Sequence, residues 1–289
     1  MGRWKYEVFR ILCRRPWTGK EAYIKSYKSR FPFSIGTTSY ILPVKEDSLT
    51  ANVRFLKDSF DLVQLLFFGR NYLDEVMSPQ TIGNLKAVRE ETGLRYTIHL
   101  PADLELLNPA EDSMNESIDV MERIMSETEP LDVEGYILHV DALEHGSPRV
   151  ELNRDQVSLF QRSLNAIANR FGTAAGNILI ENTSYDLTYF SGTIMRNPCQ
   201  ICMDAGHFAL YNHDAGRYIE LFSSRIGQVH LHGVSDGRDH RMLTDLNTLS
   251  GSNVSLFLKK FTGPVIIEVY NLNDLMKSAE FLEKKFGSL

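Results

Sequence analysis

Short apolar runs rich in β-branched and aromatic residues alternate along this chain with longer segments in which apolar residues recur every three or four positions. The first pattern is typical of buried strands, and the second of helices that bury one face. The runs predict strands at residues 34–39, 62–67, 95–100, 135–140, 177–181, 200–204, 228–232 and 264–269. The longer segments predict helices that include 78–92, 113–127, 154–170 and 273–286. Repeated strand–helix units in this number predict a TIM (β/α)8 barrel, an α/β fold.

Local signals agree with these helices. Ile82, Leu85 and Val88 share one face of the segment 78–92, so that face is expected to pack on the strands. Ser78 and Pro79 suit the position before the helix and its first turn. Glycines at 93 and 172 stand where the first and third of these helices should end.

The 289 residues form either two small domains or one large barrel, and the even spread of apolar segments favours one barrel over residues 31–289. Residues 1–30 are basic and are expected to form a separate N-terminal arm or helix. Such an arm can be a solvated element packed on the floor of the barrel, or it can reach an anionic partner, a neighbouring subunit or a membrane surface.

Composition narrows the range of partners and locations. The formal net charge of −6 argues against a protein that holds duplex DNA mainly by neutralising phosphates. No segment reads as a transmembrane helix or a signal peptide. Cys13, Cys199 and Cys202 offer no disulfide framework, as expected in a reducing compartment, so we expect a cytoplasmic protein. The Cys199/Cys202 spacing resembles half a zinc site, but two buried structural thiols fit a strand better.

Acids and histidines recur at the ends of the predicted strands. Barrel enzymes build their sites where the strands end and in the loops that follow, so these side chains are expected to meet at one mouth. Imidazole and carboxylate groups are the ligands that Zn²⁺, Mn²⁺ and Fe²⁺ take in proteins. The sequence therefore predicts a centre for two or three divalent ions, with ligands from His99, His139, Glu181, Asp204, His207, His230, Asp239, His240 and Glu268.

The number of candidate ligands bears on the chemistry. A mononuclear sugar isomerase or epimerase needs only a set such as Glu181, Asp204, His230 and Glu268, whereas two ions suit the hydrolysis of a phosphoester. The surplus of ligands favours the hydrolase. Glu181 is the candidate bridging ligand, because a carboxylate can join two ions and an imidazole cannot. Glu268 or Asp204 can alternatively accept a proton from the attacking water, so Glu181, Glu268 and Asp204 are the candidate catalytic residues.

Candidate substrate contacts follow the first and seventh strands. At the first strand the candidates are Thr37, Thr38, Ser39 and Tyr40. Hydroxyl groups and a flexible backbone in this segment suit a polar substrate, although turn formation explains the same residues about as well. His232 lies two residues beyond His230 and shares its face, so it is an alternative ligand, a supporting group or a substrate contact.

Several short motifs occur in a specific order: His99-Leu100-Pro101, Glu181-Asn182-Thr183, Asp204-Ala205-Gly206-His207, His230-Leu231-His232 and Glu268. Together they resemble the xylose isomerase-like barrel superfamily, which includes endonuclease IV and sugar-phosphate isomerases. The endonuclease IV pattern implies one metal held by His99, His139 and Glu181, a second by Glu181, Asp204, His230 and Glu268, and a third by His207, Asp239 and His240. Asp239 and His240 are adjacent here, whereas one residue separates them in that pattern.

A closer resemblance, from Phe33 to the end, is to the cobamide-remodelling phosphodiesterases of the CbiR family. It is carried by Gly36-Thr-Thr-Ser-Tyr-Ile-Leu-Pro43, Asn52-Val-Arg-Phe-Leu56 with Leu62-Val-Gln-Leu-Leu-Phe67, Tyr96-Thr-Ile-His-Leu-Pro101 and Asp236-Gly-Arg-Asp-His240. The resemblance implies hydrolysis of the nucleotide-loop phosphodiester of adenosylcobalamin and related corrinoids, with a metal-activated water as nucleophile. It departs at Gln64, where those relatives carry a glutamate.

Three other functions fit much of the same pattern. An abasic-site endonuclease shares most of the ligands, but it would need basic and wedge-forming loops at the barrel mouth. The loop after the third strand is acidic instead, with Asp103, Glu105, Glu111 and Asp112. A mononuclear isomerase or epimerase, and a barrel that binds a corrinoid or sugar without turnover, are the other two.

Overall fold

Eight parallel strands close into a barrel in the computed structural model, which describes residues 24–42, 48–140, 154–243 and 253–287. Each strand pairs with its neighbours in the order β1-β10-β7-β6-β5-β4-β3-β2, and the predicted TIM barrel is therefore confirmed. The strands are β1 (Ser34–Thr38), β2 (Leu62–Leu66), β3 (Arg95–His99), β4 (Tyr136–Leu138), β5 (Ile178–Glu181), β6 (Gln200–Asp204), β7 (Ile226–Leu231) and β10 (Pro264–Ile267). Their positions agree with the predicted runs to within a few residues at each end.

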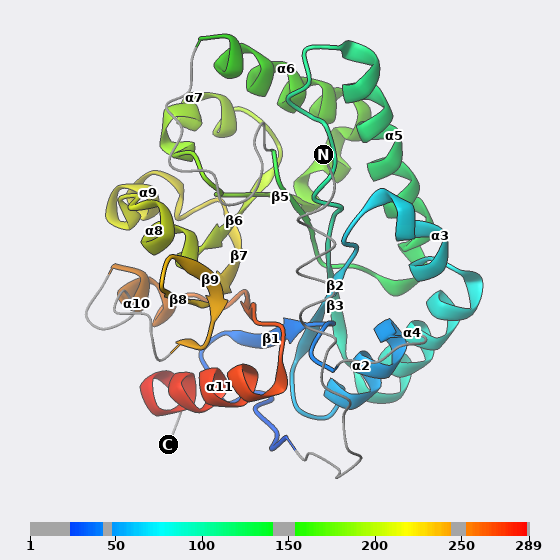
Figure 1. Ribbon diagram of the computed structural model, residues 1–289, viewed down its shortest axis with the longest axis vertical. Helices are drawn as coiled ribbons and strands as arrows, with labels where there is room; N and C mark the ends of the chain where they lie inside the picture. The colour runs from blue at the N-terminus through cyan, green and yellow to red at the C-terminus, as the bar shows by residue number, and fades with distance from the viewer. Residues whose placement is uncertain (1–23, 43–47, 141–153, 244–252, 288–289) are drawn as a thin grey trace.

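Helices surround the strands (Figure 1). They are α2 (Ser48–Leu56), α3 (Leu73–Val76), α4 (Pro79–Thr92), α5 (Glu111–Glu127), α6 (Arg154–Phe171), α7 (Ser191–Ile194), α8 (Ala205–Tyr211), α9 (Ala215–Phe222), α10 (Asn253–Leu258) and α11 (Leu272–Phe286). The ends of α4 form as its sequence predicts. The Ser78 hydroxyl accepts a hydrogen bond from the Thr81 amide, and Gly93 ends the helix with a φ of 69°, which glycine adopts without strain.

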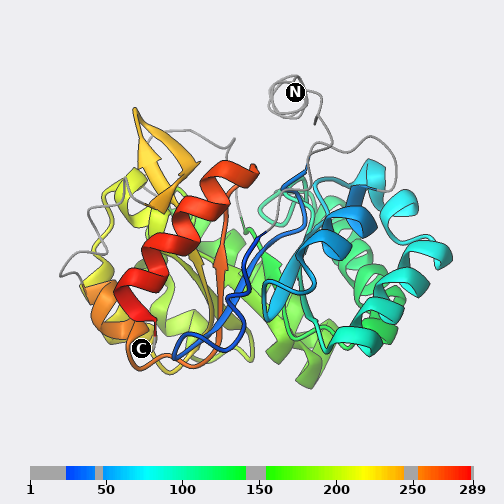
Figure 2. The same ribbon diagram turned by 90° about the horizontal axis from the view of Figure 1, so that it is seen from below.

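A two-stranded antiparallel hairpin, β8 (Gly233–Ser235) and β9 (Arg238–Arg241), was not among the predicted elements. Its strands carry no apolar alternation, because neither packs a face into the core. The turn residues Asp236 and Gly237 have φ values of 53° and 69°, the positive values that tight hairpin turns require. The hairpin follows β7 and projects beyond the barrel on the side toward which β10 points (Figure 2).

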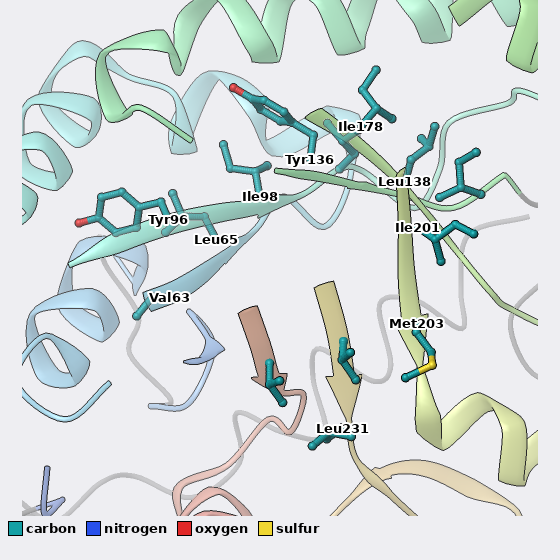
Figure 3. Packing of buried hydrophobic residues seen from close by; sticks show 14 of the residues in the cluster. Val63, Leu65, Tyr96, Ile98, Tyr136, Leu138, Ile178, Ile201, Met203 and Leu231 are labelled. Carbon is teal, nitrogen blue, oxygen red and sulfur yellow. The ribbon is translucent and has the colours of Figure 1, made fainter. Parts of the chain in front are cut away.

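Each barrel strand has two buried faces of different character. One face packs outward against the helices and is apolar, as Figure 3 shows for Val63, Leu65, Tyr96, Ile98, Tyr136, Leu138, Ile178, Ile201, Met203 and Leu231. The alternate residues point into the barrel, since successive side chains of a strand face opposite ways. Ile137, Leu179 and Cys202 form a separate apolar cluster there. The inward residues nearer the strand ends are polar, and they form the site described below.

Residues 24–30, the described part of the predicted N-terminal arm, pack on the barrel without forming a helix. Ile24 and Tyr27 are buried in the core, and Lys25 and Arg30 both pair with Glu283 of α11. The rest of the arm lies outside the described residues, and its role at a subunit interface stays a prediction. No helix in the described ranges has the length and apolar character needed to span a membrane.

Because each amphipathic helix buries only one face, substitutions on its buried and exposed faces should differ in their effect on the free energy of unfolding. Replacing the fully buried Leu282 of α11 with alanine should lower the free energy of unfolding by about 2–5 kcal/mol, because it leaves a cavity in the helix–sheet layer. The matched control is Leu256→Ala, since Leu256 of α10 is 59% exposed and its loss should cost less than about 0.5 kcal/mol. Equilibrium urea unfolding of both variants measures the difference, and equal costs would contradict the packing described here.

Candidate metal centre

The carboxyl ends of the barrel strands bring six predicted ligands to one place. His99 and Glu181 are the last residues of β3 and β5, and Asp204 is the last residue of β6. The other three are His139 directly after β4, His230 within β7 and Glu268 directly after β10. None of the six is more than 9% exposed. The convergence predicted from their positions along the chain is thus present.

Two histidines lie on one side of Glu181. The Nε2 atoms of His99 and His139 are 3.2 Å apart, and they lie 3.6 and 3.2 Å from Oε2 of Glu181. All three ligand atoms lie within 4.8 Å of one another, close enough to hold one metal ion.

A second set of ligands lies on the other side of Glu181. His230 Nδ1 is 2.9 Å from Oε2 of Glu268, 3.4 Å from Oε2 of Glu181 and 3.9 Å from Oδ2 of Asp204. These four residues also form a group with ligand atoms within 4.8 Å of one another. Glu181 belongs to both sets, and a carboxylate is the ligand type that can join two ions. The two sets have the same members as the first and second ligand sets that the resemblance to the endonuclease IV pattern implies.

The donor set fits a cation. Oε2 of Glu181, Nδ1 of His230 and Oε2 of Glu268 are buried, and apart from their close contacts within the two ligand sets none has a hydrogen-bond partner among the described residues. Buried polar atoms are otherwise almost always hydrogen-bonded, because leaving them unpaired costs about 1–3 kcal/mol each. A divalent ion would satisfy all three atoms at once.

The buried carboxylates of Glu181 and Glu268 stay ionised. Burial raises the pKa of Glu181, but the adjacent His230 and His139 outweigh it and hold the pKa well below its usual value. The same balance of burial against His230 and His240 holds the pKa of Glu268 well below its usual value. Both groups are therefore in the form that binds a metal at neutral pH.

Asn182 orients two of the predicted ligands, a role that was not predicted from the sequence. Its side chain accepts a hydrogen bond from the Asp204 amide (2.8 Å) and donates one to the Asp204 carbonyl (2.9 Å). Its carbonyl oxygen lies 2.8 Å from Nδ1 of His207, and the same Nδ1 is 3.6 Å from Oε1 of Glu181 and 3.6 Å from Oδ2 of Asp204. Its place directly after Glu181 was the available signal, because a residue next to a strand-end ligand lies at the same rim.

Two buried amides fix the ring of His230. Its Nε2 lies 2.9 Å from Oε1 of Gln64 and 2.9 Å from the amide of Gln228, and the two amides are themselves 2.6 Å apart. Because one amide must accept from the other, an amide oxygen faces Nε2 whichever way the pair is turned. A neutral ring with its proton on Nε2 would donate to this oxygen and direct the Nδ1 lone pair toward Glu181 and Glu268, the form that can bind a metal. Gln64, which stands where the resemblance implies a glutamate, thus still provides a hydrogen-bond acceptor.

The third predicted ligand set is arranged differently. His207, Asp239 and His240 do not form one group among the described residues; His207 groups with Asp204 and His232, and His240 with His232 and Glu268. Asp239 Oδ1 instead lies 3.1 Å from Nδ1 of His240. The reason is the buried ring of His232, which lies against both His207 and His240, at ring-centre distances of 5.4 and 4.5 Å.

The predicted substrate contacts after β1 are mostly engaged within the barrel. Thr37 and Thr38 are fully buried and donate to the carbonyls of Ile267 and Val269, and the Ser39 hydroxyl accepts from the Leu66 amide. The Tyr40 ring is partly exposed and packs edge-on against Phe68. Any substrate contact by these residues stays a prediction.

The cysteines in the described residues are buried free thiols, as the strand assignment predicted. Burial raises the pKa of both Cys199 and Cys202 to about 12, so both stay protonated. Cys202 lies close to Glu181 and His230 and belongs to the inward face of β6. Tyr270, a residue that the sequence did not point to, donates to Glu268 at 3.4 Å.

Comparisons with known proteins agree with this fold. The model of a family described as xylose isomerase-like TIM barrels matches residues 53–285. Similar solved structures include a D-tagatose 3-epimerase-like protein (TM-score 0.67, 19% identity, 88% of this chain and 97% of that one) and D-psicose 3-epimerase (0.65, 16%, 89% and 100%). Endonuclease IV from Thermus thermophilus is also similar (0.57, 17%, 87% and 99%).

At these identities the structural similarities establish the fold alone, and no curated protein sequence matches this chain. The family match covers most of the chain and includes all six ligands of the two sets. The chain therefore belongs to the family of xylose isomerase-like TIM barrels.

Proposed function

We propose that this protein is a metal-dependent phosphodiesterase that acts on a cobamide. One water is consumed, the P–O bond to the nucleoside of the nucleotide loop breaks, and an α-ribazole-type nucleoside leaves with cobinamide phosphate as the other product. The observation that carries the proposal is the place of Glu181 between two sets of ligands. A single-ion reaction would leave the His99 and His139 pair without a role.

Two divalent ions held by these sets would activate water and stabilise negative charge on the phosphoryl oxygens. The other roles in the reaction are assigned to side chains of the two ligand sets. Glu181 would connect the two sets, and the hydrogen-bonded His230 keeps Nδ1 directed at Glu268 and Glu181. Glu268 or Asp204 would accept the proton of the attacking water, since both carboxylates lie in the second set.

The corrinoid substrate is proposed from the sequence motifs, and the charge of the protein agrees with it. A net charge of −6 suits a small-molecule substrate better than duplex DNA. The acidic loop after β3 also favours a small-molecule substrate over duplex DNA. Arg70 neutralises part of the charge of this loop, because it lies 3.7 Å from Asp103 and 3.8 Å from Glu105.

Sugar epimerisation is the second candidate. Glu181, Asp204, His230 and Glu268 suffice for one ion, and the two epimerase structures superpose with higher TM-scores than endonuclease IV does. The pair of histidines beside Glu181 is the feature that favours the phosphodiesterase over this candidate.

The deciding experiment joins metal analysis of the purified full chain with mass detection of products. After incubation with adenosylcobalamin, we expect free α-ribazole and cobinamide phosphate at two ions per chain. Parallel incubations with D-psicose and with abasic-site DNA test the rivals. Epimerisation of the sugar with intact cobalamin, or cleavage of the DNA, would overturn the proposal.

Glu181→Gln tests the connecting carboxylate. The change keeps the shape of the side chain but removes its charge, so we expect at least about a 100-fold loss of phosphodiesterase turnover, since even supporting residues of metal sites cost 10–100-fold. Circular dichroism should report an intact fold. The control is Glu280→Gln on the exposed face of α11, which should leave turnover unchanged. Full turnover with full metal content in Glu181→Gln would contradict the connecting role.

Gln64 offers a second test through metal affinity. Gln64→Leu removes the amide oxygen that faces Nε2 of His230, so the affinity for Mn²⁺ or Zn²⁺ should fall about 10–100-fold. Gln64→Glu keeps an acceptor there and should retain the affinity. Competition with a chromogenic chelator measures both, and equal affinities for the leucine variant and the wild type would show that Gln64 does not orient the ring.

A further inference from the structure

His232 lies where the predicted third group of ligands would have to meet. The ring is fully buried, stacks on His240 at 4.5 Å with an interplanar angle of 20°, and lies edge-on to His207 at 5.4 Å. The rings of His207 and His240 are 6.3 Å apart. The role of His232 therefore decides whether this corner of the site can hold an ion.

The chain provides a fitted space for this ring. A Cβ atom on Gly206 would lie 2.1 Å from Cε1 and 2.3 Å from Nδ1 of His232, closer than any real contact. Only glycine at this position lets the ring pack on the segment that joins Asp204 to His207. The ring is thus held by the backbone at the start of α8, and its direction is fixed.

A backbone hydrogen bond then fixes the proton on the ring. The His240 amide donates to Nδ1 of His232 at 3.0 Å, and an amide N–H cannot become an acceptor. In the neutral ring the proton is therefore on Nε2. The opposite tautomer would donate from Nδ1 to the Gly233 carbonyl at 3.2 Å, but its proton would oppose the His240 N–H.

The protonated Nε2 faces Asp204. It lies 3.1 Å from Oδ2, while Oδ1 of the same carboxylate accepts from the His207 amide at 2.8 Å. Both oxygens of Asp204 are thus oriented by hydrogen bonds. A doubly protonated ring would also carry a proton on Nε2, so in both forms this nitrogen donates to Asp204 and has no lone pair for a metal.

We infer that His232 is a positioning residue for Asp204 rather than a ligand, and that the centre holds two ions and not three. The groups that contain His207 or His240 are Asp204, His207 and His232, and His232, His240 and Glu268. Without His232 each of them keeps only two ligands among the described residues. The inference rests on the metal centre of the proposed function and defines its stoichiometry.

The test counts ions and measures their affinity in the full chain. Protein stripped with chelator is reloaded with excess Mn²⁺ or, separately, Zn²⁺, desalted, and analysed for metal per chain, and the dissociation constants are measured by chelator competition. We expect two ions per chain in the wild type. His232→Ala should weaken binding at the set that contains Asp204 about 10–100-fold, because Asp204 loses the donor that orients it.

His232→Gln separates a hydrogen-bond donor from a ligand. Its amide can donate to Asp204 but is a poor ligand for these metals, so it should restore most of the affinity lost in the alanine variant. Thermal unfolding of the metal-free variants serves as the folding control. Three ions in the wild type that fall to two in both His232 variants would overturn the inference.

The outcomes also separate the inference from the proposed function. Two ions without phosphodiesterase activity would contradict the function and leave the role of His232 intact. Three ions with phosphodiesterase activity would contradict only the inference. A wild-type chain that binds no metal would overturn both.

Discussion

Closing eight strands into a barrel forces every second side chain of each strand into a narrow shared interior, and the site depends on this constraint. Deep in the barrel the interior is filled by Ile137, Leu179 and Cys202. Toward the strand ends the same inward positions carry His99, Glu181 and Asp204. The strands set the spacing, because Asp204 of β6 pairs in register with His230 of β7. Side chains far apart along the chain thus come within ligand distance of one another without any loop having to bring them there.

Burying several carboxylates in this interior is costly unless positive charge compensates them. The histidines around Glu181 and Glu268 supply part of that compensation, as the lowered pKa values of both acids indicate. The buried atoms without hydrogen-bond partners mark where the compensation is incomplete. We therefore expect the arrangement to be most stable with cations bound, which would link the folding of this barrel to metal binding.

A second layer of hydrogen-bonding groups decides how the candidate ligands are oriented. Gln64 and Gln228 fix the ring of His230, Asn182 fixes Asp204 and His207, and His232 completes the hydrogen bonding of Asp204. These contacts come from different strands and loops, so they act only when the barrel has closed. They also give Gln64 on β2 a role at the position where the resemblance in the sequence implies a glutamate. It supplies an acceptor to a ligand and needs no charge to do so.

The sequence by itself determined the barrel and the convergence of its strand-end acids and histidines, because hydrophobic periodicity is local and the residues that end parallel strands must share one rim. The division of these residues into two candidate ligand sets came from the resemblance to the endonuclease IV pattern. The roles of Asn182, Gln64 and Gln228 could not be assigned in this way, since amides occur throughout the chain and only contacts across the barrel show what these three bind. The tertiary structure alone also decided the third group. His232 shares a face with His230 in the sequence, but its tautomer depends on the backbone of His240, and its position depends on the absence of a side chain at Gly206. Both depend on atoms that only folding brings together.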